Sequence, residues 1–208
     1  MSEGETIKEA LIYWDYHPRR PTDIYVTDMV LCPRRAFFNA KFNANPITSD
    51  ARAFIGKCIH AVLPQILKSR YPNAVFEVSC QYPLDEGYVL LGRADMVDAD
   101  CVYEFKFTSA YSGAKELYFA QANAYANMLG CGKFKVVIID RNKLDVVVLE
   151  GEKDEEAFRK VVDVANEIVK CLQYKDEEIV ELPQKSPWSW ACEHCTYKMI
   201  CRAMEGTK

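Results

Sequence analysis

The segment from Val102 to Thr108 alternates aromatic and charged side chains, with Glu104 and Lys106 two residues apart. Residues two apart share one face of an extended strand, so this carboxylate and this amine are predicted to lie side by side, opposite the aromatic rings. Nine residues before Glu104, the run Gly92-Arg-Ala-Asp95 ends another predicted strand. A short turn between the two strands lets Asp95 approach Glu104.

This trio of Asp95, Glu104 and Lys106 has the chemistry of a phosphodiester-cleaving centre. Two carboxylates from neighbouring strands and a backbone carbonyl supply the hard oxygen ligands that Mg²⁺ and Mn²⁺ prefer. A lysine beside them can orient an attacking water and stabilise charge on the phosphoryl oxygens. Taken alone, the same pattern also fits a solvent-facing strand with a cross-strand ion pair. The interpretation therefore depends on further residues.

Three other side chains fit the same chemistry. His60 follows the apolar position Ile59 at the edge of a helical apolar stripe, and its imidazole could complete the ligand set of a metal ion. Gln121 and Tyr125 are four residues apart and share a helix face, which suits contacts to a DNA backbone or to the attacking water. The alternatives are a hydrogen-bonded boundary histidine and a polar helix face with a half-buried tyrosine.

Four of the nine cysteines are patterned. Cys192, Cys195 and Cys201 stand close together near the end of the chain, and Cys32 in Leu-Cys-Pro-Arg-Arg is far upstream. Four thiolates suit either a structural Zn²⁺ ion or an iron–sulfur cluster, and a tight trio with one distant partner favours the cluster. Closing a loop of about 160 residues should stabilise the fold by several kcal/mol in the polymer picture of cross-links. The five isolated cysteines are predicted to be small buried hydrophobes.

Hydrophobic periodicity predicts the elements that carry these residues. Residues 1–25 are expected to form an irregular lead-in. Helices are predicted at about 33–41, from 50 to about 67 with Asp50 as N-cap and a kink or break at Pro64, at 114–129 and at 154–173. Strands are predicted at 75–83, 88–98 and 101–108 as a meander, and at 134–141 and 144–150 as a hairpin. This order predicts a single α/β or α+β domain over residues 1–208, with a central sheet flanked by helices.

Composition restricts the class of protein. Half of the 208 residues are hydrophobic, which indicates a globular chain with one sizeable core. The apolar runs are too short to cross a bilayer, and the acidic start lacks the features of a signal peptide, so we expect a cytoplasmic protein and no membrane partner. The formal net charge of −4 argues against a protein that coats nucleic acid with a basic surface, but not against an enzyme that holds a short stretch of DNA.

Together the motifs resemble a known family. Their order is Cys32, His60, Gly92-Arg-Ala-Asp95, Glu104-Phe-Lys106, Gln121-x-x-x-Tyr125 and Cys192-x-x-Cys195-x-x-x-x-x-Cys201. This order resembles the RecB-like nucleases with an iron–sulfur clasp, and among them the CRISPR-associated exonucleases of spacer-acquisition modules, the fourth numbered CRISPR-associated family. The resemblance covers roughly residues 27 to 202, and the order and spacing of the motifs are more specific than any one of them.

The resemblance implies a restriction-endonuclease-like core and an Mg²⁺- or Mn²⁺-dependent DNA exonuclease. By motif match, the implied metal ligands are His60, Asp95, Glu104 and the carbonyl of Phe105. Lys106 is the implied catalytic lysine, and Gln121 and Tyr125 assist with DNA or water. Cys32, Cys192, Cys195 and Cys201 are implied to bind an iron–sulfur cluster, for which 4Fe–4S is preferred to 2Fe–2S. The expected partners are DNA that is single-stranded or has single-stranded ends, and CRISPR integrase proteins.

Two alternatives stay open at this point. One is a RecB-type nuclease that serves DNA repair or end processing outside CRISPR; because the chain carries no Gly-rich phosphate loop, a helicase would have to be a separate partner. The other is a non-catalytic DNA-binding module with a vestigial metal site. The intact Asp95, Glu104 and Lys106 count against the second alternative.

Overall fold

The computed structural model describes residues 2–13, 19–43, 51–109, 112–174, 182–193 and 195–205 of the chain. These residues divide into two compact units, which we describe separately. The first comprises residues 1–18, 47–80 and 93–155, and the second comprises residues 19–46, 81–92 and 156–208. The predicted N-cap Asp50 lies outside the described residues.

The first unit carries helices and strands in an order close to the predicted one. Its elements are α1 (Glu3–Tyr13), α4 (Ala51–Leu67), the first part of β2 (Val75–Pro83), the last part of β3 (Val89–Asp98), β4 (Cys101–Phe107), the short η2 (Ser112–Ala114), α5 (Lys115–Leu129), β5 (Lys133–Ile139) and β6 (Val146–Glu152). Strand β3 pairs with both β2 and β4, which confirms the predicted meander. Strands β3 and β4 are antiparallel, β4 and β5 are parallel, and β5 and β6 form an antiparallel pair.

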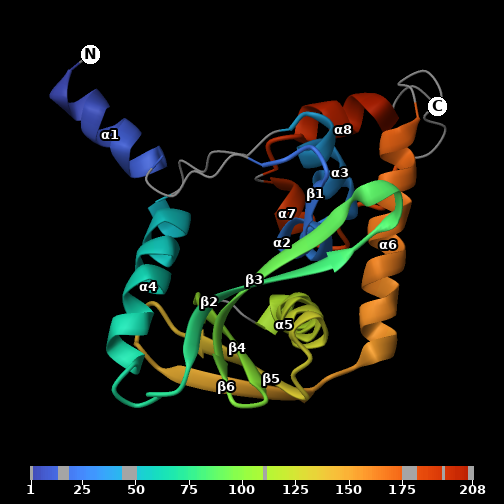
Figure 1. The fold of residues 1–208 in the computed structure, drawn as a ribbon. Coiled ribbons are helices and arrows are strands. Elements are labelled where there is room, and N and C mark those ends of the chain that lie inside the picture. Colours follow the sequence, from blue (N-terminus) through green and yellow to red (C-terminus); the bar gives the residue numbers. More distant parts are fainter. Residues whose placement is uncertain are drawn as a thin grey trace. The chain divides into compact units, whose positions relative to one another are not determined.

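Helix α5 is the crossover that makes β4 and β5 parallel, since parallel neighbours cannot be joined by a tight turn. It packs against these two strands (Figure 1). Phe119 of α5 meets Phe134 of β5 edge to face, with ring centroids 5.3 Å apart. The helix ends at Gly130, whose φ of 73° gives the left-handed cap that glycine adopts most readily. The end of the helix agrees with the predicted range of 114–129.

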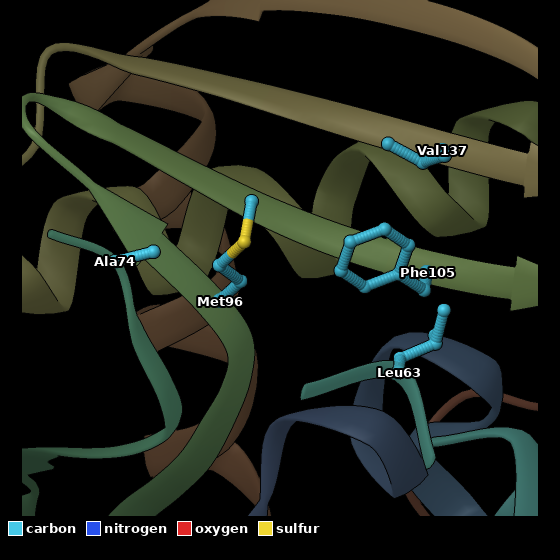
Figure 2. Close-up of a cluster of buried hydrophobic side chains, with 5 residues drawn as sticks. All are labelled: Leu63, Ala74, Met96, Phe105 and Val137. Carbon is cyan, nitrogen blue, oxygen red and sulfur yellow. The ribbon is translucent and has the colours of Figure 1, made fainter. Parts of the chain in front are cut away.

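Helix α4 covers the other face of the same strands. Leu63 packs with Ala74, Met96, Phe105 and Val137 in one buried cluster, drawn in Figure 2. Because Phe105 is two residues from Tyr103, both rings point to this face, as the alternation predicted. Glu104 and Lys106 must therefore point to the face that α5 covers. The alternation of one strand thus separates the apolar core from the polar residues.

Helix α4 continues through Pro64 without the break that was one of the two predicted outcomes, although proline lacks the N–H that would bond the carbonyl of His60 four residues earlier. The predicted apolar stripe is also wider than the buried face: Ile55, Val62 and Ile66 are exposed in this structure. The pattern predicted the helix correctly but overestimated how much of it is covered.

The second unit joins segments from both ends of the chain. It contains β1 (Asp23–Tyr25), α2 (Val26–Leu31), α3 (Pro33–Lys41), the short η1 (Asp85–Gly87), nearly all of α6 (Glu155–Gln173), α7 (Ser189–Glu193) and α8 (Lys198–Glu205). Strand β1 runs parallel to Val89–Leu91 of β3. Phe38 of α3 packs on Tyr197, just before α8, and the Tyr197 hydroxyl donates to Asn39 Oδ1 at 2.8 Å.

The expectation of an irregular lead-in over residues 1–25 was wrong in part. Helix α1 and strand β1 both fall within it. The three-residue β1 is too short to show a period in sequence, and it forms because the amino-terminal part of β3 offers it a partner. Within the described residues, no helix combines the length and the apolar character needed to span a bilayer.

Candidate active site

The site forms where strands β3 and β4 separate. Their ladder ends with the pair Met96–Tyr103, so the next residues in register, Asp95 and Glu104, face each other outside it. Beyond that pair the described ladder gives the Phe105 N–H no backbone partner on β3, and the Asp95 side chain replaces it: Asp95 Oδ2 accepts a hydrogen bond from the Phe105 N–H at 2.6 Å. The predicted approach of two neighbouring strands is confirmed, since Asp95 of β3 contacts the backbone of β4.

His60 reaches this opening from α4. Its Nδ1 lies 2.9 Å from Asp95 Oδ1, so the two Asp95 oxygens contact groups on different elements. Burial tends to lower the pKa of His60, but the hydrogen bond and charge of Asp95, with the nearby charge of Glu104, outweigh it and raise the pKa above its usual value. The predicted partnership of His60 with Asp95 is therefore present in the fold.

A second polar cluster joins β4 to α5. Lys106 Nζ donates to Glu104 Oε1 at 2.7 Å and to Gln121 Oε1 at 2.9 Å. The Gln121 amide nitrogen donates to the same Glu104 oxygen at 2.8 Å and to the Tyr125 hydroxyl at 3.0 Å. Four predicted residues thus form one hydrogen-bonded network on one face of the sheet, as the four-residue spacing on α5 required.

Glu104 is the least satisfied member of the network. Its side chain is 4% exposed, and its second oxygen, Oε2, is buried without a hydrogen-bond partner. Burial first, and then the charge of Asp95, raise the pKa of Glu104 to about 7 despite the opposing charge of Lys106. A buried, unpaired carboxylate oxygen is costly unless a cation or donor approaches it. The residues around it therefore fit a divalent metal ion.

Lys106 keeps its positive charge. Burial alone would lower its pKa, but the charges of Glu104 and Asp95 outweigh burial and raise it. The lysine nitrogen also lies 5.1 Å from the centre of the Tyr118 ring, a cation–π contact. Tyr118 was not predicted as a site residue, although it stands three residues before Gln121 and so shares its helix face. That spacing was the available signal.

Glu77 of β2 is the other residue that the sequence analysis missed. Among the described residues, His60, Glu77 and Asp95 form a group of possible metal ligands. Each offers one ligand atom, and these three atoms lie within 4.8 Å of one another. Glu77 also pairs with Arg93, whose Nε lies 2.8 Å from Glu77 Oε2. Its backbone has a positive φ of 54°, which is unusual for glutamate and which no sequence pattern announces.

The four patterned cysteines all belong to the second unit. The Ser186 N–H donates to Cys32 Sγ at 3.3 Å, and Arg34 Nη1 donates to Cys201 Sγ at 3.4 Å. Burial raises the pKa of the Cys32 thiol. In the described part of the chain, no three of these sulfur atoms lie within 4.8 Å of one another, as the ligands of one shared metal ion would. The fold gathers the two ends of the chain, but not into a compact mononuclear site.

The five isolated cysteines behave only partly as predicted. Cys80 and Cys131 are buried, and burial raises the pKa of Cys80 to about 12, as expected for an inert buried thiol. Cys58, Cys101 and Cys171 are only half-buried, so the prediction was wrong for them.

The chain is similar to known proteins both in sequence and in fold. No protein-family model matches the chain. It is 24% identical over 198 residues to the CRISPR-associated exonuclease Cas4 of Saccharolobus solfataricus, and the match covers 90% of this chain and 91% of that protein. The crystal structure of SSO0001 matches with a TM-score of 0.69 at 22% identity and covers 98% of each chain.

A more distant structure shares the same fold. An alkaline exonuclease, LHK-Exo from Laribacter hongkongensis, matches with a TM-score of 0.55 at 9% identity, over 79% of this chain and 92% of its own. The expected fold class, a nuclease-type α/β core with helices flanking a central sheet, is confirmed. These likenesses extend over nearly the full length of SSO0001 and of LHK-Exo.

Proposed function

We propose that this Cas4-like chain is a divalent-metal-dependent DNA exonuclease that processes DNA fragments for CRISPR spacer acquisition. The observation that carries the proposal is the polar network at the β3–β4 opening. It combines a histidine–carboxylate pair, a buried carboxylate with an unpartnered oxygen, and a half-buried lysine that remains charged. A solvent-facing strand, the main alternative in the sequence, would not bury Glu104 or bond Lys106 to a helix.

His60, Asp95 and Glu104 would hold the metal, together with the carbonyl of Phe105. The Phe105 N–H points to Asp95. Because the N–H and C=O of one strand residue point to the same neighbouring strand, this supports a Phe105 carbonyl directed to the opening. A bound Mg²⁺ or Mn²⁺ would lower the pKa of a water molecule and neutralise charge on the phosphate.

The other residues of the network bind and orient. Lys106 is close to Glu104 and charged, so it can hold the attacking water and stabilise the developing negative charge on the phosphoryl oxygens. Gln121 fixes Lys106 from α5, and Tyr125 in turn fixes the Gln121 amide. These bonds restrain the lysine before the substrate arrives, which is the condition for electrostatic stabilisation of a transition state. Gln121 and Tyr125 are thus positioning residues.

We extend the proposal to an iron–sulfur cluster at Cys32, Cys192, Cys195 and Cys201. A tetrahedral Zn²⁺ site with Zn–S bonds of about 2.3 Å would require sulfurs about 3.8 Å apart. In a cluster the thiolates bind different iron atoms, so their sulfurs lie farther apart than around one ion. The tight trio of cysteines with one distant partner in the sequence is what favours a cluster, preferably 4Fe–4S. The Ser186 N–H bond to Cys32 is the kind of contact that tunes such clusters.

The place in CRISPR rests on the sequence likeness to Cas4. The substrate we propose is DNA with single-stranded character, and the proposed partners are CRISPR integrase proteins. A nuclease of DNA repair would share the same active site, so the partner distinguishes the two roles. Co-purification of the chain with an integrase encoded beside it would support the CRISPR role, whereas association with a helicase would favour repair.

The catalytic proposal is tested by digestion of end-labelled single- and double-stranded DNA with Mn²⁺, using anaerobically purified full-length protein. We expect Asp95→Asn and Lys106→Met each to reduce degradation by about 100-fold or more while leaving the circular dichroism spectrum unchanged. Lys135→Met is the matched control, because Lys135 is also paired with a glutamate on this sheet. Unchanged digestion by both active-site variants would refute the site, and DNA binding without cleavage by the wild type would indicate a binding module.

A further inference from the structure

Glu77 stands at the metal-binding end of the site but has no role in the proposal above. One of its carboxylate oxygens, His60 nitrogen and one Asp95 oxygen all lie within 4.8 Å of one another. Around an octahedral ion with bonds of about 2.1 Å, neighbouring ligand atoms are about 3 Å apart and opposite ones about 4.2 Å apart. The three residues are therefore spaced closely enough to share one ion after small side-chain movements.

The backbone and one neighbour hold Glu77 in this position. Its φ of 54° interrupts the regular alternation of β2, and such interruptions are common beside active sites, where they re-aim a side chain. The ion pair with Arg93 then restrains the carboxylate through Oε2. Arg93 lies two residues before Asp95 on β3, so the restraint comes from the strand that carries the proposed ligand.

A second observation points to a cation. Glu104, opposite Asp95 across the strand opening, has a buried oxygen without a partner. Glu77 and Asp95 lie beside His60, and the charge of Glu104 on a third strand also acts on His60. With His60 neutral, these three carboxylates outnumber the cations Lys106 and Arg93 by one charge, which a bound divalent ion can balance.

We propose that Glu77 is a further protein ligand of the divalent ion, and binds it through a carboxylate oxygen beside His60 and Asp95. This inference rests on the proposed function to the extent that both require an ion at these two residues. Glu77 adds a third carboxylate to the ligand set, which favours a hard cation such as Mn²⁺ or Mg²⁺ over a softer one. It also ties β2 to the site, so metal binding restrains all three strands of the meander.

The test is direct measurement of Mn²⁺ binding without DNA, by electron paramagnetic resonance of free Mn²⁺ and by calorimetry on the full chain. Glu77→Gln keeps the size of the side chain and should weaken Mn²⁺ binding by at least about tenfold. Glu77→Asn is a second neutral variant, because asparagine adopts left-handed backbone more readily than most residues. Glu150→Gln is the control: Glu150 is also ion-paired at 2.8 Å on this sheet but lies on β6, and wild-type affinity is expected.

The outcomes separate this inference from the proposed function. Wild-type Mn²⁺ affinity in folded Glu77→Gln or Glu77→Asn overturns the role of Glu77. If Asp95→Asn loses Mn²⁺ binding in the same experiment, the proposed metal site survives that result. If Asp95→Asn also binds Mn²⁺ like the wild type, or if the wild type binds none, both proposals fall.

Discussion

The affinity of this chain for Mn²⁺ should fall steeply as the pH falls from 8 to 6. Metal ligands must lose their protons before they bind, so His60 must be neutral and Glu104 ionised. The fold raises the pKa of both groups: that of Glu104 to about 7, mainly through burial, and that of His60 through Asp95 and Glu104 in spite of burial. Both groups therefore bind protons more readily in the metal-free fold than they would in water.

The magnitude follows from the pKa of Glu104. Each pH unit below that pKa weakens binding about tenfold, or by about 1.4 kcal/mol, because the ion must displace the proton. With a pKa of about 7, Glu104 alone should reduce Mn²⁺ affinity about tenfold between pH 8 and pH 6. The proton on His60 adds to this reduction. A plot of the logarithm of affinity against pH should therefore have a slope above one in the acidic part of the range.

Calorimetry of Mn²⁺ binding at several pH values, in buffers of different ionisation enthalpy, measures both the affinity and the protons released. Glu104→Gln removes one titrating ligand, so its slope should fall by about one unit as its affinity falls at every pH. A wild-type affinity that does not change between pH 6 and pH 8 would refute the assignment of these groups as ligands. An unchanged slope in Glu104→Gln would refute the part assigned to Glu104.

The same pKa values predict how the metal-free protein responds to pH. A group whose pKa is raised on folding stabilises the fold fully at a pH below its pKa in the unfolded chain. This contribution is lost as the pH rises through its pKa in the folded protein. For Glu104 this window runs from its ordinary 4.5 to about 7. Metal-free protein should therefore lose stability across this range in thermal denaturation, and Mn²⁺ should restore it above pH 7. Equal stability at pH 5 and pH 7.5 without metal would contradict the burial argument.

Three further predictions concern single residues. Gln121→Leu should lower the rate of DNA degradation more than it lowers Mn²⁺ affinity, since Gln121 bonds both Lys106 and Glu104 but is not itself a proposed ligand. Equal losses of both would contradict this role. Cys32→Ser should yield colourless protein with less iron and a lower melting temperature, and a fully iron-loaded brown variant would contradict the cluster. Gly151→Ala should destabilise the chain by about 1–3 kcal/mol in denaturant unfolding, because the added Cβ would lie 2.2 Å from Phe134 Cζ, whereas Gly56→Ala has open space and serves as the control.

The sequence predicted most of the site because each residue obeyed a local period. Glu104 and Lys106 share a face since they are two apart on a strand, and Gln121 and Tyr125 share one since they are four apart on a helix. Such relations survive folding because they depend only on the backbone of one element. The pairing of His60 with Asp95 joins a helix to a strand 35 residues away. The position of His60 at the edge of the apolar stripe suggested it, and the resemblance to a known family supported it through the order of the motifs.

Glu77 could not be found in this way, for a physical reason. Strict alternation on β2 would place its side chain opposite Phe76, which packs in the apolar cluster, so the pattern predicts only a polar face and no specific partner. The left-handed backbone at Glu77 is a local departure from the strand that neither Gly nor Asn marks in the sequence. The side chain is then placed by β3, through Arg93, rather than by its own strand. An unfavourable backbone conformation such as that of Glu77 persists only where contacts from the surrounding structure hold it in place. Such conformations are concentrated at functional sites. The departure therefore strengthens the case that Glu77 acts on the ion beside His60 and Asp95.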